Sequence, residues 1–296
     1  MMNKKLRGSI SLMAATVIWG SAFIAQSVGM DYIEPFTFQA VRCFLAVLFL
    51  VPVIFLFDGN KKQYFKNWTD PQLWKTGLFC GAALFVAAGL QQVGLVYTTA
   101  GKAGFITAMY IVLVPILGLF FRNRPSPAAW FSVGIAVIGL YLLSCVGVNE
   151  INIGDICLMG CALFFAVQIT LVDRMAQNLD GLRLNCIQSL VCAALSAVMM
   201  VFTESPDTEN ILACWLPLGY AGVLSMGVAY SLQIIGQKHV EPTPASLIMS
   251  LESVFAMVFG WLLLDESMAA YELLGCGLVF AAVILSQLPT KEKKHA

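Results

Sequence analysis

The chain has 296 residues, of which 59% are hydrophobic and 11% are charged, and its mean hydropathy is +0.82. No soluble domain sustains so apolar a composition over this length, so the sequence predicts an all-α integral membrane protein that crosses the bilayer many times. Its 17 basic and 17 acidic residues give a net charge of zero. A protein that binds nucleic acids usually carries an excess of basic residues, so this balance argues against that function.

Apolar windows separated by short polar breaks predict ten transmembrane helices. The first window is longer than the apolar core of a signal peptide, so we interpret it as a retained helix. The longest breaks, residues 58–71 and 203–210, are too short to hold a soluble domain. The predicted spans are 8–28, 36–57, 73–96, 102–121, 128–146, 154–173, 183–202, 211–236, 244–264 and 268–288.

The basic residues are distributed unevenly between the two sides of the predicted membrane. With the N-terminus in the cytosol, 15 of the 17 lie on the cytosolic side, Lys102 lies outside and Arg42 lies within the second span. Basic residues concentrate in cytosolic loops of membrane proteins, so the pattern predicts cytosolic N- and C-termini. Two cytosolic termini require an even number of spans, in agreement with ten.

The chain contains an internal repeat. Residues 86–118 align without a gap with residues 228–260, at a shift of 142, and 8–13 align with 154–159, at a shift of 146. Five spans are thus followed by five similar ones, and because five is odd the second set must be inserted upside down. We predict two inverted five-helix repeats, 1–147 and 148–289, and a cytosolic tail, 290–296. Inverted repeats with a site at their interface are typical of secondary transporters.

Several motifs resemble the EamA family of the drug/metabolite transporter superfamily. They are Trp19-Gly20, residues 40–44, residues 97–103, and residues 250–256 with 260–266. The resemblance covers nearly the whole chain. It implies ten helices, cytosolic termini, a central cavity, a bacterial inner membrane location and small metabolites or amphipathic drugs as cargo. Two departures, Ser253 where proline is common and Arg122-Asn-Arg124 after the fourth helix, leave the cargo open.

The ninth span carries a carboxylate, Glu252, near its middle. With Thr243 as the helix cap and Pro244 as the first helical residue, Glu252 lies about 12 Å inside the cytosolic end. A carboxylate at this depth is costly, which makes it a candidate proton carrier or counter-charge for cationic cargo. The alternative is a structural role, in which it pairs with Arg42 or a glutamine of a neighbouring helix.

Tyr110 occupies the repeat position equivalent to Glu252, and Thr107 lies one helical turn before it. We expect their hydroxyls to face the carboxylate across the repeat interface. The alternative for Tyr110 is an anchor at the membrane surface, although its mid-span depth disfavours that role.

Gln91 and Gln233 are also equivalent positions, and Tyr230 lies one turn before Gln233. An amide can bind a carboxylate, an amine or another amide, which suits neutral or zwitterionic cargo. Equally, buried glutamines form hydrogen bonds that join membrane helices.

Arg42, Trp19 and Gln168 complete the candidate site. Arg42 lies about 9 Å inside the external end of the second span, where it would either attract a substrate carboxylate or extend along the helix to the membrane surface. Trp19 would either stack on cargo or fill space in the bundle.

No cofactor or metal site is predicted. The nine cysteines lie in or beside apolar runs without a C-x-x-C spacing, and there are only two histidines. The Walker motif is absent, as are the common hydrolase motifs, so neither an ATP-driven pump nor an enzyme is indicated.

We therefore expect a secondary transporter that exports a small organic metabolite, amino-acid-like or amphipathic, by alternating access, with proton coupling through Glu252 as one option. Its expected partners are the substrate, the lipid bilayer and protons; a homodimer is not indicated. One alternative is a membrane scaffold or partner subunit that does not transport. A weaker one is a membrane-embedded lipid transferase, because its acidic pair would be Asp265 and Glu266, which are adjacent rather than on one helix face.

Overall fold

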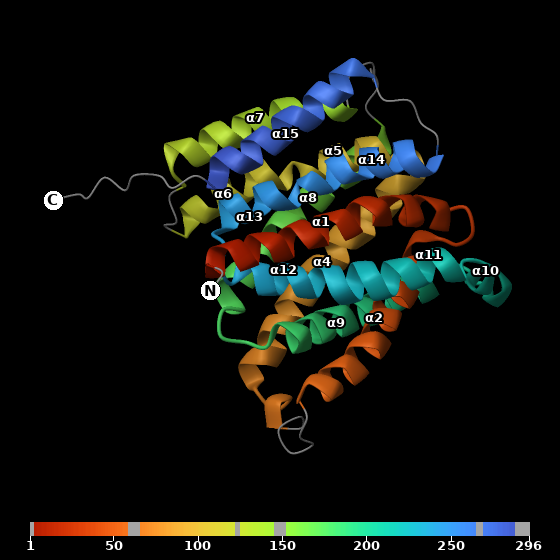
Figure 1. Cartoon of the computed structure of the whole chain (residues 1–296). Helices are drawn as coiled ribbons and strands as arrows, with labels where there is room; N and C mark the ends of the chain where they lie inside the picture. Colours follow the sequence, from red (N-terminus) through yellow and green to blue (C-terminus); the bar gives the residue numbers. More distant parts are fainter. Residues whose placement is uncertain (1–2, 59–65, 122–124, 145–151, 265–268, 288–296) are drawn as a thin grey trace.

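The computed structural model describes residues 3–58, 66–121, 125–144, 152–264 and 269–287, and all regular structure in these ranges is helical (Figure 1). The predicted boundary between residues 147 and 148 and the tail 290–296 lie outside these ranges. The helices are α1 (Lys4–Gly29), α2 (Pro35–Asp58), α4 (Pro71–Tyr97), α5 (Ala100–Ala108), α6 (Tyr110–Phe120), α7 (Pro127–Ser144), α8 (Ile153–Met175), α9 (Gly181–Thr203), α10 (Thr208–Ala213), α11 (Trp215–Gly219), the π-helix η1 (Tyr220–Ala229), α12 (Tyr230–Gln237), α13 (Pro242–Met249), α14 (Leu251–Leu264) and α15 (Ala270–Gln287).

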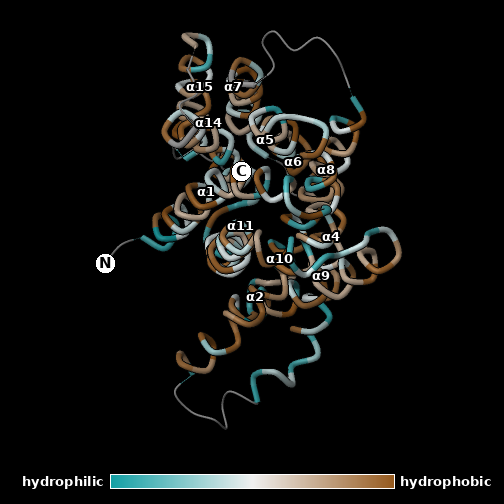
Figure 2. The backbone as a smooth tube through the Cα atoms, turned by 90° about the vertical axis from the view of Figure 1, so that its right-hand side faces the viewer, coloured by the Kyte–Doolittle hydropathy of each residue, from teal (hydrophilic) through white to brown (hydrophobic). Residues whose placement is uncertain are grey.

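Within the described ranges, nine helical segments are long and apolar enough to cross a bilayer. Residues Pro127–Leu142 of α7 form a further, shorter apolar helix. In Figure 2 hydrophobic residues run along the helices, whereas hydrophilic residues gather toward chain ends and connections. The protein is therefore a multi-pass membrane protein.

Polar residues in the breaks start several helices. Asp70 accepts a hydrogen bond from the Gln72 amide (2.9 Å) ahead of Pro71, the first residue of α4. Asn152 and Asp155 form a reciprocal capping box at the start of α8. Such side chains satisfy amide groups that have no partner in the first helical turn, which is why the polar breaks define helix ends so sharply.

Two spans predicted as continuous, 102–121 and 244–264, are instead interrupted near their middles. α5 and α6 are separated at Met109, and α13 and α14 at Ser250. At the first break the Met109 amide bonds to Ile106 three residues back (3.2 Å), and at the second the Ser250 hydroxyl bonds to the Leu247 carbonyl (2.8 Å). These local bonds tighten the backbone at each break. Neither break contains a proline, so the sequence pattern did not indicate the two interruptions.

The predicted cap of the ninth span was wrong. Glu241 precedes α13 and Pro242 is its first residue, so Thr243 lies inside the first turn rather than ahead of it. Proline suits the first helical position because its fixed φ is already helical and its missing N–H would have no partner there. Pro242 therefore begins the helix two residues earlier than Pro244 would.

Tightly packed helix crossings occur in related pairs. A methyl group added at Gly8 would lie 2.8 Å from the Gly236 carbonyl oxygen, and one at Gly154 would lie 2.9 Å from that of Gly94. The first contact joins α1 to α12 and the second joins α8 to α4. Only residues without a side chain allow such approach, so glycine is required at both crossings.

A second pair of crossings follows the same plan. Gly81 of α4 packs against Gln188 of α9, and Gly222 of η1 packs against Arg42 of α2, with added methyl groups at 2.8 and 2.9 Å from the respective carbonyl oxygens. All four contacts join one half of the chain to the other. Corresponding partners are related by offsets of 141, 142 or 146, at or within one residue of the offsets found in the sequence repeat.

The helix pairs α7–α15 and α2–α9 lie at opposite sides of the bundle, with α1, α4, α8 and α12 between them (Figure 1). The largest buried apolar cluster extends through this middle layer and includes Tyr110, Phe165 and Tyr230. Phe57, Phe120 and Phe202 are at least four-fifths exposed, as expected for side chains that face lipid. The cavity described below lies in this middle layer.

Candidate functional site

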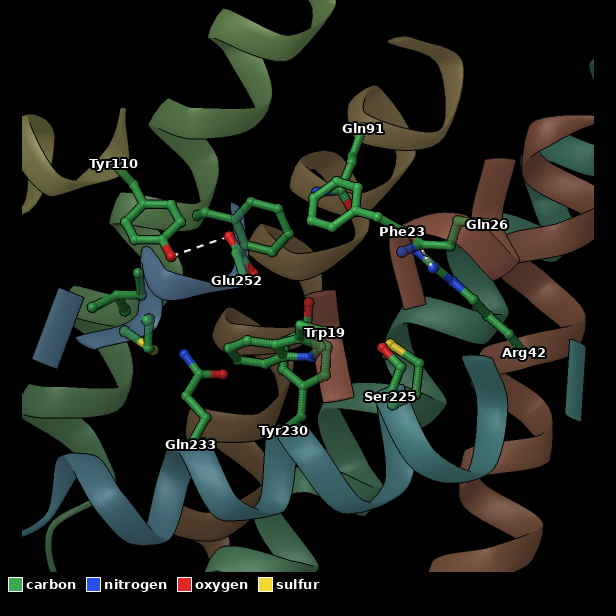
Figure 3. A pocket seen from close by; sticks show the side chains of 14 residues that line it. Trp19, Phe23, Gln26, Arg42, Gln91, Tyr110, Ser225, Tyr230, Gln233 and Glu252 are labelled. Carbon is green, nitrogen blue, oxygen red and sulfur yellow. Dashed lines mark hydrogen bonds between the residues drawn. The ribbon is translucent and has the colours of Figure 1, made fainter. Parts of the chain in front are cut away.

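A cavity lies among helices from both halves of the chain (Figure 3), and its empty space, including space open to solvent, is about 490 Å³. The lining residues come from α1, α2, α4, α6, α8, η1, α12, α13 and α14. They are Trp19, Phe23, Gln26, Arg42, Gln91, Tyr110, Phe165, Ile169, Ser225, Met226, Tyr230, Gln233, Met249 and Glu252.

Glu252 and Tyr110 meet directly on the cavity wall. The Tyr110 hydroxyl donates to Glu252 Oε1 at 3.1 Å, and both residues are buried. The carboxylate thus lies against its repeat equivalent, and not against Arg42 or a glutamine as the structural alternative expected. Tyr110 is the first residue of α6 and Glu252 the second residue of α14, so each lies directly after the break in its span.

Gln91 and Gln233 both line the cavity, but each is held by a different partner. Gln91 Nε2 donates to the Thr107 hydroxyl at 3.4 Å, and Gln233 Nε2 donates to Gln168 Oε1 at 3.1 Å. Thr107 and Gln168 are fully buried and do not line the cavity. Their place is behind the wall, where they orient the two cavity glutamines.

The Gln168 side chain begins a chain of amides that runs behind the cavity wall and ends at Met226, another lining residue. Gln168 donates to Gln188 at 3.4 Å, Gln188 donates to Asn185 at 2.9 Å, and Asn185 donates to the Met226 carbonyl at 2.8 Å. Linked amides that satisfy one another make the surrounding core rigid.

Aromatic side chains form the central part of the wall. The rings of Trp19 and Tyr230 pack edge to face with centroids 5.0 Å apart, and Phe23 lies next to them (Figure 3). The Trp19 indole Nε1 is buried and has no hydrogen-bond acceptor in the part of the chain that the structure describes. Such a wall can pack against the apolar part of an organic molecule, and the Trp19 N–H can donate a hydrogen bond to one acceptor atom of that molecule.

Arg42 lines the cavity away from Glu252. It is only 2% exposed, donates from Nη1 to Gln26 Oε1, and lies 5.5 Å from the centre of the Phe38 ring. The alternative in which this side chain extends to the membrane surface is therefore wrong, because Gln26 and Phe38 hold it inside the bundle.

Sequence reasoning missed Gln26, Phe23 and Ser225 as cavity residues. Trp19, Phe23 and Gln26 are spaced i, i+4 and i+7, so they share one helix face, and extending the Trp19 prediction along that face would have found the other two. Ser225 offered no comparable signal because it lies in the π-helix η1.

Among the described residues no group of three or more potential metal ligands converges. Two buried cysteines, Cys43 and Cys192, lie with their sulfurs 3.4 Å apart behind the cavity. The arrangement as a whole is a buried compartment with a carboxyl, a guanidinium, amides and aromatic rings, which suits the reversible binding of an organic molecule.

Comparison with known proteins agrees with this picture. An uncharacterized transporter of Archaeoglobus fulgidus is 34% identical over 96% of this chain and 87% of its own length. The threonine/homoserine exporter RhtA of Escherichia coli is 26% identical over 96% of this chain and 92% of its own. A crystal structure with 16% identity superposes with a TM-score of 0.78 over 95% of this chain and 96% of that one, which shows a shared fold.

The sequence profile of the EamA-like transporter family matches the chain twice, at residues 6–145 and 152–288. The two matches lie in the two halves of the chain and together cover nearly all of it. With the multi-pass helical fold and the buried cavity, they lead to one conclusion: the chain belongs to the EamA-like transporter family.

Proposed function

We propose that the protein is a secondary transporter that exports a small organic metabolite, amino-acid-like or amphipathic, across a bacterial inner membrane. The observation that carries this proposal is the cavity, whose wall pairs residues equivalent in the two halves. Tyr110 with Glu252 and Gln91 with Gln233 are related by a shift of 142. A site shared by two equivalent halves is what alternating access requires, because each half can open it to one side.

Two inverted five-helix units, 1–147 and 148–289, are the second part of the proposal. The paired glycine crossings support it, since Gly8–Gly236 is matched by Gly154–Gly94. So do the two interrupted spans, whose breaks at Met109 and Ser250 lie beside equivalent residues. Interrupted helices at corresponding positions of two halves are a recurrent feature of transporter sites. Ten spans result when α7 is counted with the nine longer segments.

The membrane orientation follows from the uneven distribution of basic residues. We propose cytosolic N- and C-termini. Reporter fusions at Arg122 and Lys238 should be active only in the cytosolic form, and one at Asp207 only in the external form. An external reporter signal at Lys238 would contradict both the orientation and the inverted arrangement.

Export, and an amino-acid-like cargo, are proposed partly on the likeness to RhtA. That relative is named as an exporter of threonine and homoserine, and the present cavity has side chains able to bind the polar groups of such molecules. The rival, a scaffold that does not transport, predicts no ligand-sized polar cavity between the halves, and the cavity therefore favours transport.

Coupling to protons is proposed through Glu252. It is the one carboxylate among the cavity-lining residues, it contacts the Tyr110 hydroxyl, and its span is interrupted beside it. A membrane-buried carboxyl that faces a compartment able to open to either side can take up a proton on one side and release it on the other.

The test is transport by purified protein in liposomes, with and without a pH gradient. The Glu252→Gln variant keeps size and hydrogen bonding but removes the titratable group. We expect it to bind and transport cargo down its own gradient, and to lose the acceleration that a pH gradient gives the native protein. Glu241→Gln, which alters an exposed carboxylate ahead of α13, is the matched control and should behave like the native protein. Unchanged acceleration in Glu252→Gln would rule out coupling through this residue, and no transport of any compound would favour the scaffold.

A further inference from the structure

Arg42 is a buried cation on the cavity wall, and among the described residues no carboxylate lies within salt-bridge distance of its guanidinium. Its side-chain partners are the neutral amide of Gln26 and the thiol of Cys43. Within the described ranges its Nε is buried and has no hydrogen-bond partner. That N–H belongs to one of the guanidinium edges that can bind a carboxylate through two parallel hydrogen bonds.

Two other basic side chains of the described ranges that are largely buried pair with carboxylates. Lys102 contacts Asp155 at 2.7 Å, and Arg183 contacts Asp180 at 3.0 Å and also Asp58. Burying a charge without a counter-charge is costly, so an unpaired arginine persists in a membrane protein where it has a function. Arg42 thus differs from Lys102 and Arg183 because no described carboxylate contacts it.

Glu252 is too far along the bundle to supply that anion by direct contact. Gly20 of α1 packs against Phe255 and Ala256 of α14, and the two helices run in the same direction (Figure 1). From that level Gln26 lies six residues onward and Glu252 three residues back, which at 1.5 Å per residue separates the two by about 13 Å along the helices.

The space between the two ends is lined by aromatic rings. In Figure 3 the Phe23 ring lies between Glu252 on one side and Arg42 on the other, with Gln91 beside it and with Trp19 and Tyr230 below. The middle of the cavity therefore combines aromatic rings with one amide, and its cationic end is formed by Arg42 and Gln26.

We propose that Arg42, braced by Gln26, binds the carboxylate of the transported molecule, and that the substrates are organic carboxylates with an apolar body that lies along Phe23, Trp19 and Tyr230. This inference rests on the proposed function and narrows it to a substrate class and an orientation. Amino acids with apolar side chains belong to the class, and so do the corresponding acids that lack the amino group.

The test uses three compounds that share a phenyl body: L-phenylalanine, 3-phenylpropanoate and 2-phenylethylamine. Binding to detergent-solubilised protein is measured by titration calorimetry and by thermal stabilisation, because a ligand that binds only the folded state raises its apparent stability. We expect the two carboxylates to bind more tightly than the amine. In Arg42→Gln their affinity should fall by roughly 10- to 100-fold, the loss expected for a charge-assisted hydrogen bond, whereas any binding of the amine should be unchanged.

Two further variants keep the test decisive. Arg42→Lys retains the charge but not the forked geometry, so carboxylate affinity should fall to an intermediate value; this variant also serves if Arg42→Gln does not fold. Arg174→Gln is the matched control, because Arg174 also lies over an aromatic ring, Phe121, but outside the cavity. It should bind all three compounds as the native protein does.

The inference is overturned if neither carboxylate binds, or if loss of Arg42 weakens the amine and the carboxylates equally. Transport assays in liposomes separate this failure from failure of the proposed function. If the native protein transports the amine but binds no carboxylate, the carboxylate subsite is wrong and the transporter proposal stands. If it neither binds nor transports any compound of a wider metabolite panel, both are wrong.

Discussion

Two arginines of this protein are almost equally buried and yet differ in their surroundings. Arg42 and Arg183 are 2% and 1% exposed, and each lies over an aromatic ring, at 5.5 Å from Phe38 and 5.6 Å from Trp68. Arg183 contacts two carboxylates, Asp58 and Asp180, whereas Arg42 contacts an amide, a thiol and the cavity. The comparison teaches that burial alone does not distinguish a structural arginine from a candidate binding residue; the charge of its partners does.

The largest effect on stability is expected for Arg183→Gln. The change leaves Asp58 and Asp180 without their cation, and breaking a buried pair costs about 3–5 kcal/mol, reduced here to roughly 2–3 kcal/mol because Asp180 is partly exposed. The free energy of unfolding in mixed detergent measures it. A loss below the error of that measurement would mean that the cluster does not stabilise the fold, and the contrast with Arg42 would fail.

A smaller loss is expected for Lys102→Met. Lys102 of α5 pairs with Asp155 of α8, whose side chain also accepts a hydrogen bond from the Asn152 amide at 3.0 Å. Because that bond remains, we expect a loss of about 1–2 kcal/mol. Adding Asp155→Asn removes the unpaired charge and should recover part of the loss. A double variant less stable than the single one would show that Asp155 acts mainly as the cap of α8.

Tyr110→Phe should have a still smaller effect on stability, about 1 kcal/mol, because one hydrogen bond to Glu252 is lost while the ring is kept. The informative readout is transport. If Glu252 carries protons, the pH dependence of transport should shift in Tyr110→Phe, since the hydroxyl that contacts the carboxylate is gone. An unshifted pH profile with normal folding would make the contact purely structural.

The smallest effect on stability is expected for Arg42→Gln, within about 0.5 kcal/mol of the native protein or slightly stabilising, because it removes a buried charge that has no counter-charge. Stability is again measured by unfolding in mixed detergent, without ligand. The contrast with Arg183→Gln is the sharpest form of the comparison. A loss as large as that of Arg183→Gln would place Arg42 among the structural charges.

Much of the fold was readable from the sequence, because apolar runs of helical length and polar breaks are strong local signals. The two broken spans were not, since nothing in the apolar pattern marks Met109 or Ser250. The contact between Tyr110 and Glu252 followed from the repeat offset, as residues equivalent in two related halves can meet where those halves touch. Gln26 was missed although it lies on the same helix face as Trp19, because a single amide near the end of a span also suits a surface position; in the structure it contacts Arg42.

The positions of the Thr107 and Gln168 side chains relative to the cavity could be assigned only from the structure. Helical spacing placed both near the candidate site, but not on which side of the wall their side chains lie. In the structure they hold Gln91 and Gln233 in position from behind. Whether a residue lines a cavity or lies behind its wall depends on a distance of about one side-chain length. The spacing of residues in the sequence does not resolve such a distance.

The π-helix η1 lies where the offset between equivalent residues of the two halves changes. The equivalent glycine contacts relate Gly81 to Gly222 at an offset of 141, but Gly94 to Gly236 at an offset of 142. One extra residue has therefore been inserted between residues 222 and 236, and a π-helix is how an otherwise α-helical segment accommodates one. Deleting it would turn the following segment by about 100° and carry Tyr230 off the cavity wall. A chimera that copied the corresponding part of α4 in place of η1 would thus keep the helix packing and lose one wall of the cavity.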